Sequence, residues 1–175
     1  MCGFIGYFGK KKLDKSKFKN ISNQLNHRGP DSEGFFFQED KKVNVYFGFK
    51  RLSILDLSKN SNQPMKFRNK IILFNGEIYN YIEIRKKLIK LGYKFFSNGD
   101  TEVVLKAIYE WGSNAYKLFK GMWAIVIYDK ATNHISFSRD RFGEKPLYYF
   151  LCDDGIFFAS EIKTLRELIP IKTKI

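Results

Sequence analysis

The chain has 175 residues, 44% of them hydrophobic and 17% aromatic, which suits one ring-rich domain and argues against bulk disorder. No apolar run approaches the roughly 20 residues of a membrane span. The first apolar stretch is interrupted by Gly6 and meets three lysines, unlike a signal peptide, so we expect a cytoplasmic protein. Two cysteines and two histidines are too few for a disulfide framework or a histidine-rich metal site.

The formal net charge is +13. A surface for nucleic acid or anionic lipid would explain this charge, and so would a solvated surface on a lysine-rich chain. The basic residues are spread along the sequence, and their one cluster, at 10–19, surrounds an expected helix start where exposed lysines are ordinary. We favour the solvated surface and expect neither a nucleic-acid nor a membrane partner.

The first half of the chain is expected to form a strand, a helix, a turn and three further strands. Phe18, Ile21 and Leu25 share one face of a helix over 16–26. Gly29 and Pro30 end that helix. The other expected segments are strands at 2–8, 33–38, 43–49 and 70–74, a turn at 27–31 and a loop at 58–64.

The second half begins with two helices and continues with strands. The first helix, 81–91, stops at Gly92, and Asp100 or Thr101 is expected to cap the second, 101–111. Further expected segments are a helical turn at 114–119, strands at 123–129, 135–139, 147–151 and 156–159, and a helix at 161–168 that Pro170 ends. This order is no β-α-β alternation, so it predicts an α+β layered fold of antiparallel sheets with helices outside.

Cys2 is the sharpest chemical feature. Once Met1 is removed, this residue carries a thiol and a free α-amine, whose reference pKa of about 7.7–8.0 lets it take the thiol proton directly or through a water. Such a residue is nucleophile and base in one. The competing interpretation is a small apolar residue near a terminus.

Asn75 and Gly76 follow an expected strand. An asparagine side-chain N–H and a backbone N–H can hold the oxyanion that forms when a carboxamide is attacked, and glycine permits close backbone approach. Asn-Gly is also a strong hairpin signal, and taken alone the hairpin is the better interpretation.

Arg51, Glu77 and Asp100 have charges that match free glutamine. An arginine can clamp a carboxylate in bidentate fashion, and two carboxylates can hold an α-ammonium. Taken singly, Arg51 as a strand-end surface charge and Asp100 as a helix cap are simpler interpretations. Outside this set, we expect an ion-pair network in the turn 139–143, a hydrogen-bonded turn residue in His27 and a structural role for Cys152.

Together, these pieces resemble class II glutamine amidotransferase domains of the glutamine-dependent asparagine synthetase type. The resemblance spans Cys2 to about Leu165. Its motifs, in order, are Met1–Gly6, His27–Asp31 with Gly34, Arg51–Asp56, Gln63–Met65, Asn75–Asn80, Asp100–Glu102, Gly121–Ala124, Arg139–Gly143, Lys145–Tyr148 and Phe158–Glu161. One motif would be weak, whereas this many in register is highly specific.

The resemblance implies roles for the matching positions. Cys2 is the nucleophile with its α-amine as base, and Asn75 with the Gly76 backbone forms the oxyanion hole. Glutamine is bound by Arg51, Leu52, Ser53, Ile54, Leu55, Asn75, Gly76, Glu77 and Asp100. The reaction passes through a γ-glutamyl thioester, and the ammonia is passed through a tunnel to a synthetase domain. The implied fold is the four-layer αββα N-terminal-nucleophile sandwich, two antiparallel sheets between helical layers.

Two departures accompany the resemblance. Phe49 stands where relatives commonly have a histidine, and we expect this to be tolerated. The synthetase half is absent, so we expect residues 1–175 to be one amidotransferase domain truncated at its C-terminal end. This domain needs no metal or cofactor of its own, because ATP and magnesium belong to the synthetase domain, which acts in cis or in trans. A homodimer is one option for its assembly.

Three functions compete. The first is a glutaminase that supplies ammonia for conversion of aspartate to asparagine, or for amidation of another carboxylate such as a sugar acid. The second is a non-catalytic glutamine-binding domain, against which the intact set of site residues argues. The third is a basic nucleic-acid module, which no helix-turn-helix, zinc-knuckle or RNP-type motif supports.

Overall fold

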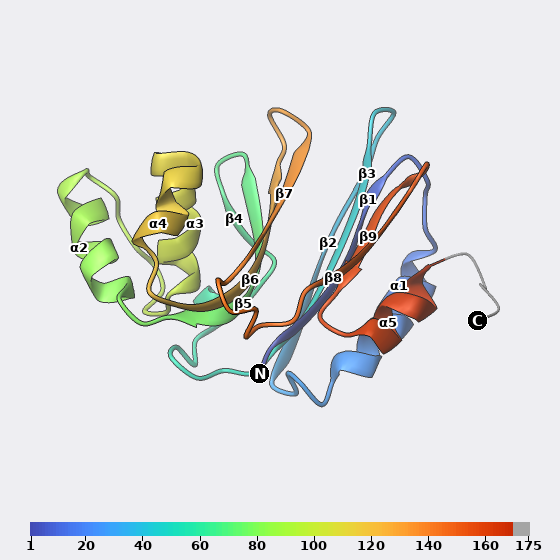
Figure 1. The fold of residues 1–175 in the computed structure, drawn as a ribbon, viewed down its shortest axis with the longest axis horizontal. Helices are drawn as coiled ribbons and strands as arrows, with labels where there is room; N and C mark the ends of the chain where they lie inside the picture. Colours follow the sequence, from blue (N-terminus) through green and yellow to red (C-terminus); the bar gives the residue numbers. More distant parts are fainter. Residues whose placement is uncertain (170–175) are drawn as a thin grey trace. The chain divides into compact units, whose positions relative to one another are not determined.

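A computed structural model describes residues 1–169, which divide into two compact units (Figure 1). Unit 1 comprises residues 1–52 and the chain from Pro146 onward, and unit 2 comprises Ser53–Lys145. Each unit has one antiparallel sheet and its own helices, which confirms the expected α+β class. Over residues 1–169, no helix has the length and apolarity to cross a membrane.

Unit 1 is built on a five-stranded antiparallel sheet in the order β2-β3-β1-β9-β8. The central strand β1 pairs with β3 through Gly3–Lys50 and with β9 through Ile5–Ala159. The strands are β1 Gly3–Gly9, β2 Ser32–Glu39, β3 Asn44–Arg51, β8 Tyr148–Cys152 and β9 Gly155–Ala159. Because β1 begins at Gly3, the sheet places Cys2 at the end of its central strand.

Two helices pack on the sheet of unit 1: α1 Lys15–Ser22 and α5 Ile162–Leu168 (Figure 1). The Asp14 side chain caps α1 by accepting a hydrogen bond from the Lys17 N–H. The helix expected over 16–26 ends at Ser22 and continues as a 3-10 turn over Asn23–Leu25. The buried cluster beneath these helices comprises Ile5, Tyr7, Phe18, Leu25, Tyr46, Phe157, Ala159, Leu165 and Leu168.

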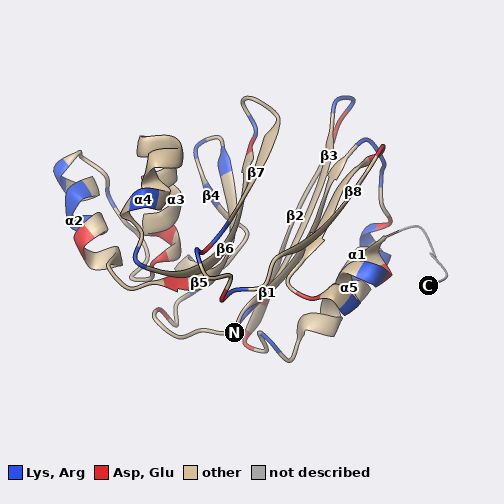
Figure 2. Cartoon of the chain, in the orientation of Figure 1, with Lys and Arg blue, Asp and Glu red and all other residues tan. Residues whose placement is uncertain are grey.

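The charged residues lie mainly on helices and connections of both units rather than on one face of one element (Figure 2). Within the basic cluster of unit 1, Lys15 pairs with Glu39, and Lys19 lies over the rings of Phe35 and Phe37. These lysines therefore have local partners in an ion pair and in cation–π contacts.

Unit 2 has a four-stranded antiparallel sheet in the order β4-β5-β6-β7. Its strands are β4 Met65–Phe67, β5 Lys70–Ile78, β6 Gly121–Asp129 and β7 His134–Arg139. Three helices lie beside this sheet in Figure 1: α2 Tyr81–Lys90, α3 Thr101–Trp111 and α4 Ala115–Leu118. The three-residue strand β4 escaped prediction because it is too short for alternation to be visible.

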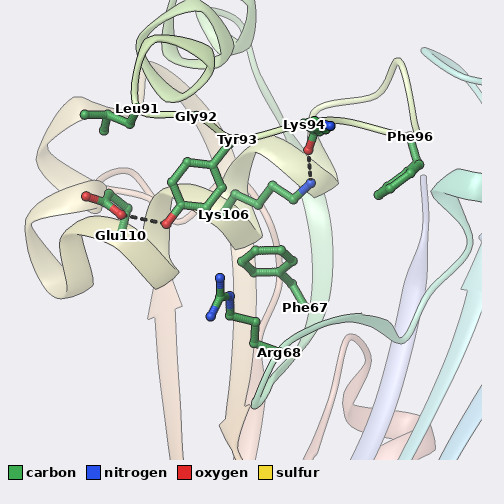
Figure 3. A pocket seen from close by; sticks show the side chains of 9 residues that line it. All are labelled: Phe67, Arg68, Leu91, Gly92, Tyr93, Lys94, Phe96, Lys106 and Glu110. Atoms are coloured by element: carbon green, nitrogen blue, oxygen red, sulfur yellow. Dashed lines mark hydrogen bonds between the residues drawn. The ribbon is translucent and has the colours of Figure 1, made fainter.

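One lysine of α3 is buried beside a surface cavity of unit 2 (Figure 3). The Lys106 ammonium pairs with Glu102 and donates to the Lys94 carbonyl oxygen, each at 2.5 Å. The ring of Phe95 lies 4.5 Å from its nitrogen. These contacts offset the cost of burying the charge, so Lys106 has a structural role. The cavity has a volume of about 390 Å³.

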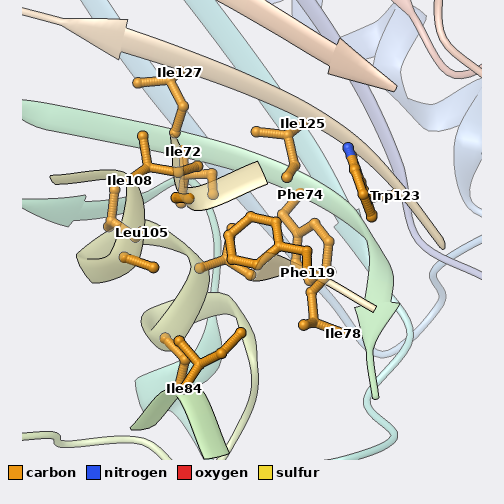
Figure 4. Packing of buried hydrophobic residues seen from close by; sticks show 14 of the residues in the cluster. Ile72, Phe74, Ile78, Ile84, Leu105, Ile108, Phe119, Trp123, Ile125 and Ile127 are labelled. Carbon is orange, nitrogen blue, oxygen red and sulfur yellow. The ribbon is translucent and has the colours of Figure 1, made fainter. Parts of the chain in front are cut away.

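Apolar side chains of β5, β6 and α3 form the core of unit 2 (Figure 4). Residues at alternate positions of a strand share one face, so Ile72 and Phe74 of β5 turn toward the helices and join Leu105 and Ile108 of α3. Leu73 and Asn75 consequently lie on the opposite face of β5. This alternation separates the packing residues of β5 from the polar residues near its end.

Two expectations for unit 2 are wrong. Asn75 and Gly76 form no hairpin, because β5 runs through them to Ile78 and pairs them with Ala124 and Trp123. Asp100 precedes α3 but makes no side-chain cap. Long-range pairing with β6 outweighs the local turn preference of Asn-Gly in this strand. The helix end expected at Pro170 lies outside the described residues.

Candidate functional site

Cys2 lies at the end of β1 in unit 1, against the end of β3. Its sulfur is 3.4 Å from the backbone nitrogen of Leu52, which donates to it, and 3.5 Å from the Leu52 carbonyl oxygen. Gly3 pairs with Lys50, so the sheet register carries Cys2 alongside Arg51 and Leu52. In this structure Met1 precedes Cys2, and the nitrogen of Cys2 is therefore an amide.

Arg28 holds the main chain of Cys2. Its Nε donates to the Cys2 carbonyl oxygen at 3.0 Å, and its Nη1 donates to Glu161 at 3.1 Å. A side chain at Gly3 would put its Cβ 3.0 Å from the Arg28 side chain, so glycine leaves room for this arginine. His27 also bonds Glu161, at 2.8 Å, which confirms its expected role as a hydrogen-bonded turn residue.

The role of Arg28 in holding the main chain of Cys2 was not identified from the sequence. The signal available was an arginine inside a Gly-Pro turn, but its partners lie 26 and 133 residues away along the chain. Only the fold brings these segments together.

Arg51 is the last residue of β3 and is buried. Its carbonyl oxygen accepts from the Asp31 N–H at 3.0 Å, which fixes the strand end against the turn after Gly29. The alternative interpretation of Arg51 as a surface charge is therefore wrong. Phe49, the departure from the family pattern, is buried in the same strand.

Asn75 of unit 2 has a buried polar side chain whose donor is unsatisfied within residues 1–169. Its side chain is 2% exposed, and among the residues that the structure describes, its Nδ2 has no hydrogen-bond partner. A buried donor without a partner costs about 1–3 kcal/mol, so such groups are rare in native proteins. Strand alternation places Asn75 and Glu77 on the same face of β5.

The N–H of the next residue, Gly76, points away from β6. Its ladder partner Trp123 directs its own N–H and carbonyl toward Asp140 of the following turn, so Gly76–Trp123 is a pair without mutual hydrogen bonds. A Cβ at Gly76 would lie 2.3 Å from the Met122 carbonyl oxygen, so this close strand approach requires glycine.

The same edge of β5 is bonded by side chains on both sides of Gly76. Gln63 accepts from the Phe74 N–H at 2.6 Å and donates to the Phe74 carbonyl at 2.9 Å. Asp100 accepts from the Ile78 N–H at 2.9 Å. The pairing of β4 with β5 ends at Met65–Ile72, so the Gly76 N–H lies on an edge that no strand of unit 2 covers. The positioning role of Gln63 also went unrecognised in the sequence.

Asp100 and Glu77 put two carboxyl groups near one another at this end of β5. Asp100 is 6% exposed, and burial raises its pKa to about 6, with the charge of Glu77 acting in the same direction. A cation bound beside these groups would relieve both the burial cost and their repulsion. The pair therefore suits an ammonium group.

Ser53, Ile54 and Leu55 begin unit 2 and form no helix or strand. Ile54 is 69% exposed, so apolar packing does not hold the segment in place. The glutamine residues implied by the resemblance thus fall into two sets: Cys2, Arg51 and Leu52 in unit 1, and Ser53, Ile54, Leu55, Asn75, Gly76, Glu77 and Asp100 in unit 2.

The turn at 139–143 has a structural role, but its contacts differ from the expected ion pairs. The Asp140 carboxylate accepts from backbone N–H groups, including those of Glu144 and Lys145, and Arg139 donates to the carbonyls of Gly143 and Lys145. Cys152 is a free cysteine whose sulfur contacts the Gly155 carbonyl at 3.5 Å.

The cavity shown in Figure 3 is separate from the site residues. The lining of that cavity, Phe67, Arg68, Leu91–Lys94, Phe96, Lys106 and Glu110, includes none of them. Over residues 1–169, no group of three or more His, Cys, Asp or Glu side chains is placed to hold a metal ion.

Comparison with known proteins identifies the family of the chain. The family model of the glutamine amidotransferase domain matches residues 1–175. The glutamine-hydrolysing asparagine synthetase 1 of Bacillus subtilis is 42% identical over 94% of the chain, which spans 26% of that protein. A putative asparagine synthetase of Methanocaldococcus jannaschii is 37% identical over 99% of the chain, and the match covers 36% of that protein.

Solved structures agree on the fold. The glutamine phosphoribosylpyrophosphate amidotransferase of B. subtilis, in complex with ADP and GMP, superposes with a TM-score of 0.79 at 20% identity, over 95% of this chain and 43% of that one. The expected N-terminal-nucleophile fold is thus the fold of the chain. The family match over the whole sequence and relatives at this level of identity show that the chain belongs to the glutamine amidotransferase domain family.

Proposed function

We propose that this chain hydrolyses L-glutamine to glutamate and ammonia through a γ-glutamyl thioester on Cys2. The observation that carries the proposal is the buried Asn75 amide without a partner beside the outward Gly76 N–H. Neighbouring side-chain and backbone donors are what an oxyanion needs, and membership of the glutamine amidotransferase family supports glutamine as the substrate.

The first half of the reaction forms the thioester. After Met1 is removed, the α-amine of Cys2 takes the thiol proton, and the sulfur attacks the side-chain carboxamide carbon of glutamine. Asn75 Nδ2 and the Gly76 N–H stabilise the oxyanion of the tetrahedral intermediate. When this intermediate collapses, the C–N bond breaks and the ammonium of Cys2 returns its proton to the leaving nitrogen, which departs as ammonia.

The second half regenerates the enzyme. The same α-amine takes a proton from a water molecule, which attacks the thioester carbon, and the oxyanion again binds to the two donors. The C–S bond then breaks, the sulfur regains a proton from the amine, and glutamate leaves. One residue thus acts as nucleophile, base and acid in turn.

Substrate binding uses the charges of free glutamine. Arg51 binds the α-carboxylate, and Glu77 with Asp100 binds the α-ammonium. The segment from Leu52 to Leu55 contributes the remaining contacts. A retained Met1 would block the reaction because an amide nitrogen is no base.

The names of the relatives, which are asparagine synthetases, support a proposal for the fate of the ammonia. The chain spans about a quarter to a third of their length. We propose a synthetase domain, in cis or in trans, that uses ATP and magnesium to convert aspartate to asparagine in the cytoplasm. Amidation of another carboxylate, such as a sugar acid, would use the same glutaminase.

The decisive experiment is covalent labelling of Cys2. The chain with Met1 removed, confirmed by intact mass, is treated with a glutamine-analogue diazoketone in the presence and absence of glutamine. We expect one adduct, mapped to Cys2, that glutamine suppresses and that Cys2→Ala abolishes. Cys152→Ala is the matched control, because it removes the other thiol and should leave labelling unchanged.

The same experiment decides between the glutaminase and a glutamine-binding domain without catalysis. A chain that binds glutamine but gives neither an adduct nor ammonia would support the binding domain and overturn the catalytic proposal. Release of ammonia and glutamate in equal amounts would confirm it.

A further inference from the structure

Asp56 is a buried carboxylate within an exposed segment of unit 2. It is 8% exposed, whereas Ile54 is 69% exposed and Leu57 is 80% exposed. Its oxygens accept hydrogen bonds from the Ser58 N–H at 2.7 Å, the Ser61 hydroxyl at 2.9 Å and the Asn98 N–H at 2.7 Å. The last of these bonds spans 42 residues of sequence.

The bond to Asn98 reaches the turn that carries Asp100. Arg85 of α2 holds the other side of this turn by donating to the carbonyls of Ser97 and Gly99, each at 2.9 Å. Asp100 in turn bonds the Ile78 N–H, one residue after Glu77. Asp56 therefore ties the segment 53–58 to the turn and, through it, to the end of β5.

We propose that Asp56 is a positioning residue for glutamine, holding the backbone of Ser53–Leu55 in register with Asp100 and Glu77. This inference rests on the proposed glutaminase function. Since the segment around Asp56 has few buried apolar side chains, packing cannot fix its place. The carboxylate does so instead, because its hydrogen bonds from Ser58 and Ser61 lie on one loop and its hydrogen bond from Asn98 lies on the other.

The chemistry of these bonds predicts which substitution breaks them. The backbone N–H groups of Ser58 and Asn98 can only donate, and they bond different oxygens of Asp56. An amide in place of the carboxylate has one acceptor oxygen and would turn an NH₂ group toward a donor. Asp56→Asn therefore keeps the size of the side chain and loses one of the two bonds.

The measurement is steady-state glutamine hydrolysis by the chain with Met1 removed. For Asp56→Asn we expect KM for glutamine to rise by about tenfold to a hundredfold, the range for loss of a charged hydrogen bond. We expect kcat to change by less than about threefold, because the variant leaves Cys2, Asn75 and Gly76 in place. Ser61→Ala removes a single hydroxyl donor and should raise KM by about threefold.

Asp129→Asn is the matched control. Asp129 is another loop-bonding carboxylate of unit 2, which accepts from the Asn69 amide at 2.5 Å, the Lys70 ammonium at 2.7 Å and the Ala131 N–H at 2.9 Å. It lies at the other end of β5 and β6 from Glu77. We expect Asp129→Asn to lower the thermal midpoint and leave KM unchanged.

The outcomes separate the two proposals. A wild-type chain without glutaminase activity overturns the proposed function and this inference together. If the wild type is active, this inference alone is overturned when Asp56→Asn keeps the wild-type KM. It is also overturned when Asp56→Asn and Asp129→Asn change kcat and KM by the same factors. Should Asp56→Asn fail to fold, an unchanged KM in Ser61→Ala has the same meaning.

Discussion

The two units differ in whether their candidate site residues have hydrogen-bond partners within the unit. In unit 1, Cys2, the proposed nucleophile, has partners within the unit: its sulfur accepts from the Leu52 N–H, and its carbonyl oxygen accepts from Arg28. In unit 2, Asn75 keeps an unpaired donor, and burial raises the pKa of Asp100 to about 6. Unit 1 therefore holds its residue in place, while unit 2 has an amide donor without a partner among residues 1–169 and a buried carboxyl group with a raised pKa.

This difference teaches where a ligand is needed. A protein that loses free energy by burying an unpaired amide and an ionisable carboxyl gains it back when a ligand supplies an oxyanion and an ammonium. Glutamine and its tetrahedral intermediate supply both. Substitutions of these unit 2 residues should consequently lower activity without lowering stability. Substitutions in structural parts of unit 1 should lower stability.

The largest effect is expected from Asn75→Ala. Loss of an oxyanion donor should lower kcat by about 10²–10³-fold with little change in KM. Because the amide has no partner in the free protein, its loss should leave the thermal midpoint unchanged or higher. Glutaminase kinetics and thermal unfolding on the same samples measure both quantities.

Asn44→Ala in unit 1 is the matched control for that substitution. Asn44 is also a buried strand asparagine, but its Nδ2 donates to the Lys10 carbonyl at 2.9 Å. We expect this variant to lose stability and keep kcat. If Asn75→Ala were the less stable of the two and remained active, the contrast between the units would be broken.

A smaller effect concerns pH. Asp100 has a folded pKa of about 6, above its reference value, so it is neutral below that pH and cannot hold the ammonium of glutamine. In the Cys2→Ala background, we expect the Kd for glutamine to rise about tenfold between pH 7 and pH 5. Calorimetric titration measures this change without the chemical step.

Asp100→Asn removes this titration. The Kd of this variant for glutamine should be larger than that of the wild type at pH 7 and should not change between pH 7 and pH 5. The sign for stability is the reverse of the usual carboxylate case. Since the folded state favours the protonated form of Asp100, the contribution of this residue to stability falls as pH rises from about 4 through about 6 and then levels off. A wild-type Kd that is independent of pH over this range would show that Asp100 does not face the ammonium.

The smallest effect is expected from Glu161→Gln in unit 1. Burial would raise the pKa of Glu161, but the hydrogen bonds from His27 and Arg28 lower it, so the carboxylate steadies Arg28 at neutral pH. Weakening this support should slow diazoketone labelling of Cys2 by about threefold. Glu33→Gln, which loosens the pair with Lys50 between β2 and β3, should leave the labelling rate unchanged.

Labelling also tests the pH window of that pair. A lowered carboxyl pKa means that the contribution of Glu161 is present above its unfolded value of about 4.3 and is lost as pH falls further. The difference in labelling between wild type and Glu161→Gln should therefore persist across neutral pH. A faster labelling rate in the variant would contradict a supporting role for Glu161.

Local patterns were sufficient for most elements of the chain. The expected helix over 101–111 is α3 residue for residue, because apolar periodicity and the flanking Gly112 act within one segment. Strands with alternating or continuous apolar runs, such as β6 and β9, lie within two residues of their expected bounds. The short strand β4 and the continuation of β5 through Asn75 depend on pairing with distant residues and were beyond such patterns.

The sequence by itself determined which residue types stand at the site, because the motifs in order name the cysteine, the amide, the arginine and the carboxylates. Only the tertiary structure decided the surroundings of these residues. Among residues 1–169, the buried Asn75 amide nitrogen has no partner, and no strand of unit 2 pairs with the edge where the Gly76 N–H lies. Asp56 joins two loops 42 residues apart. The physical reason is that burial and hydrogen-bond satisfaction depend on neighbours from other segments. The sequence gives the identity of a residue directly, whereas the free-energy cost of leaving its polar group unpaired depends on the residues that surround it in the fold.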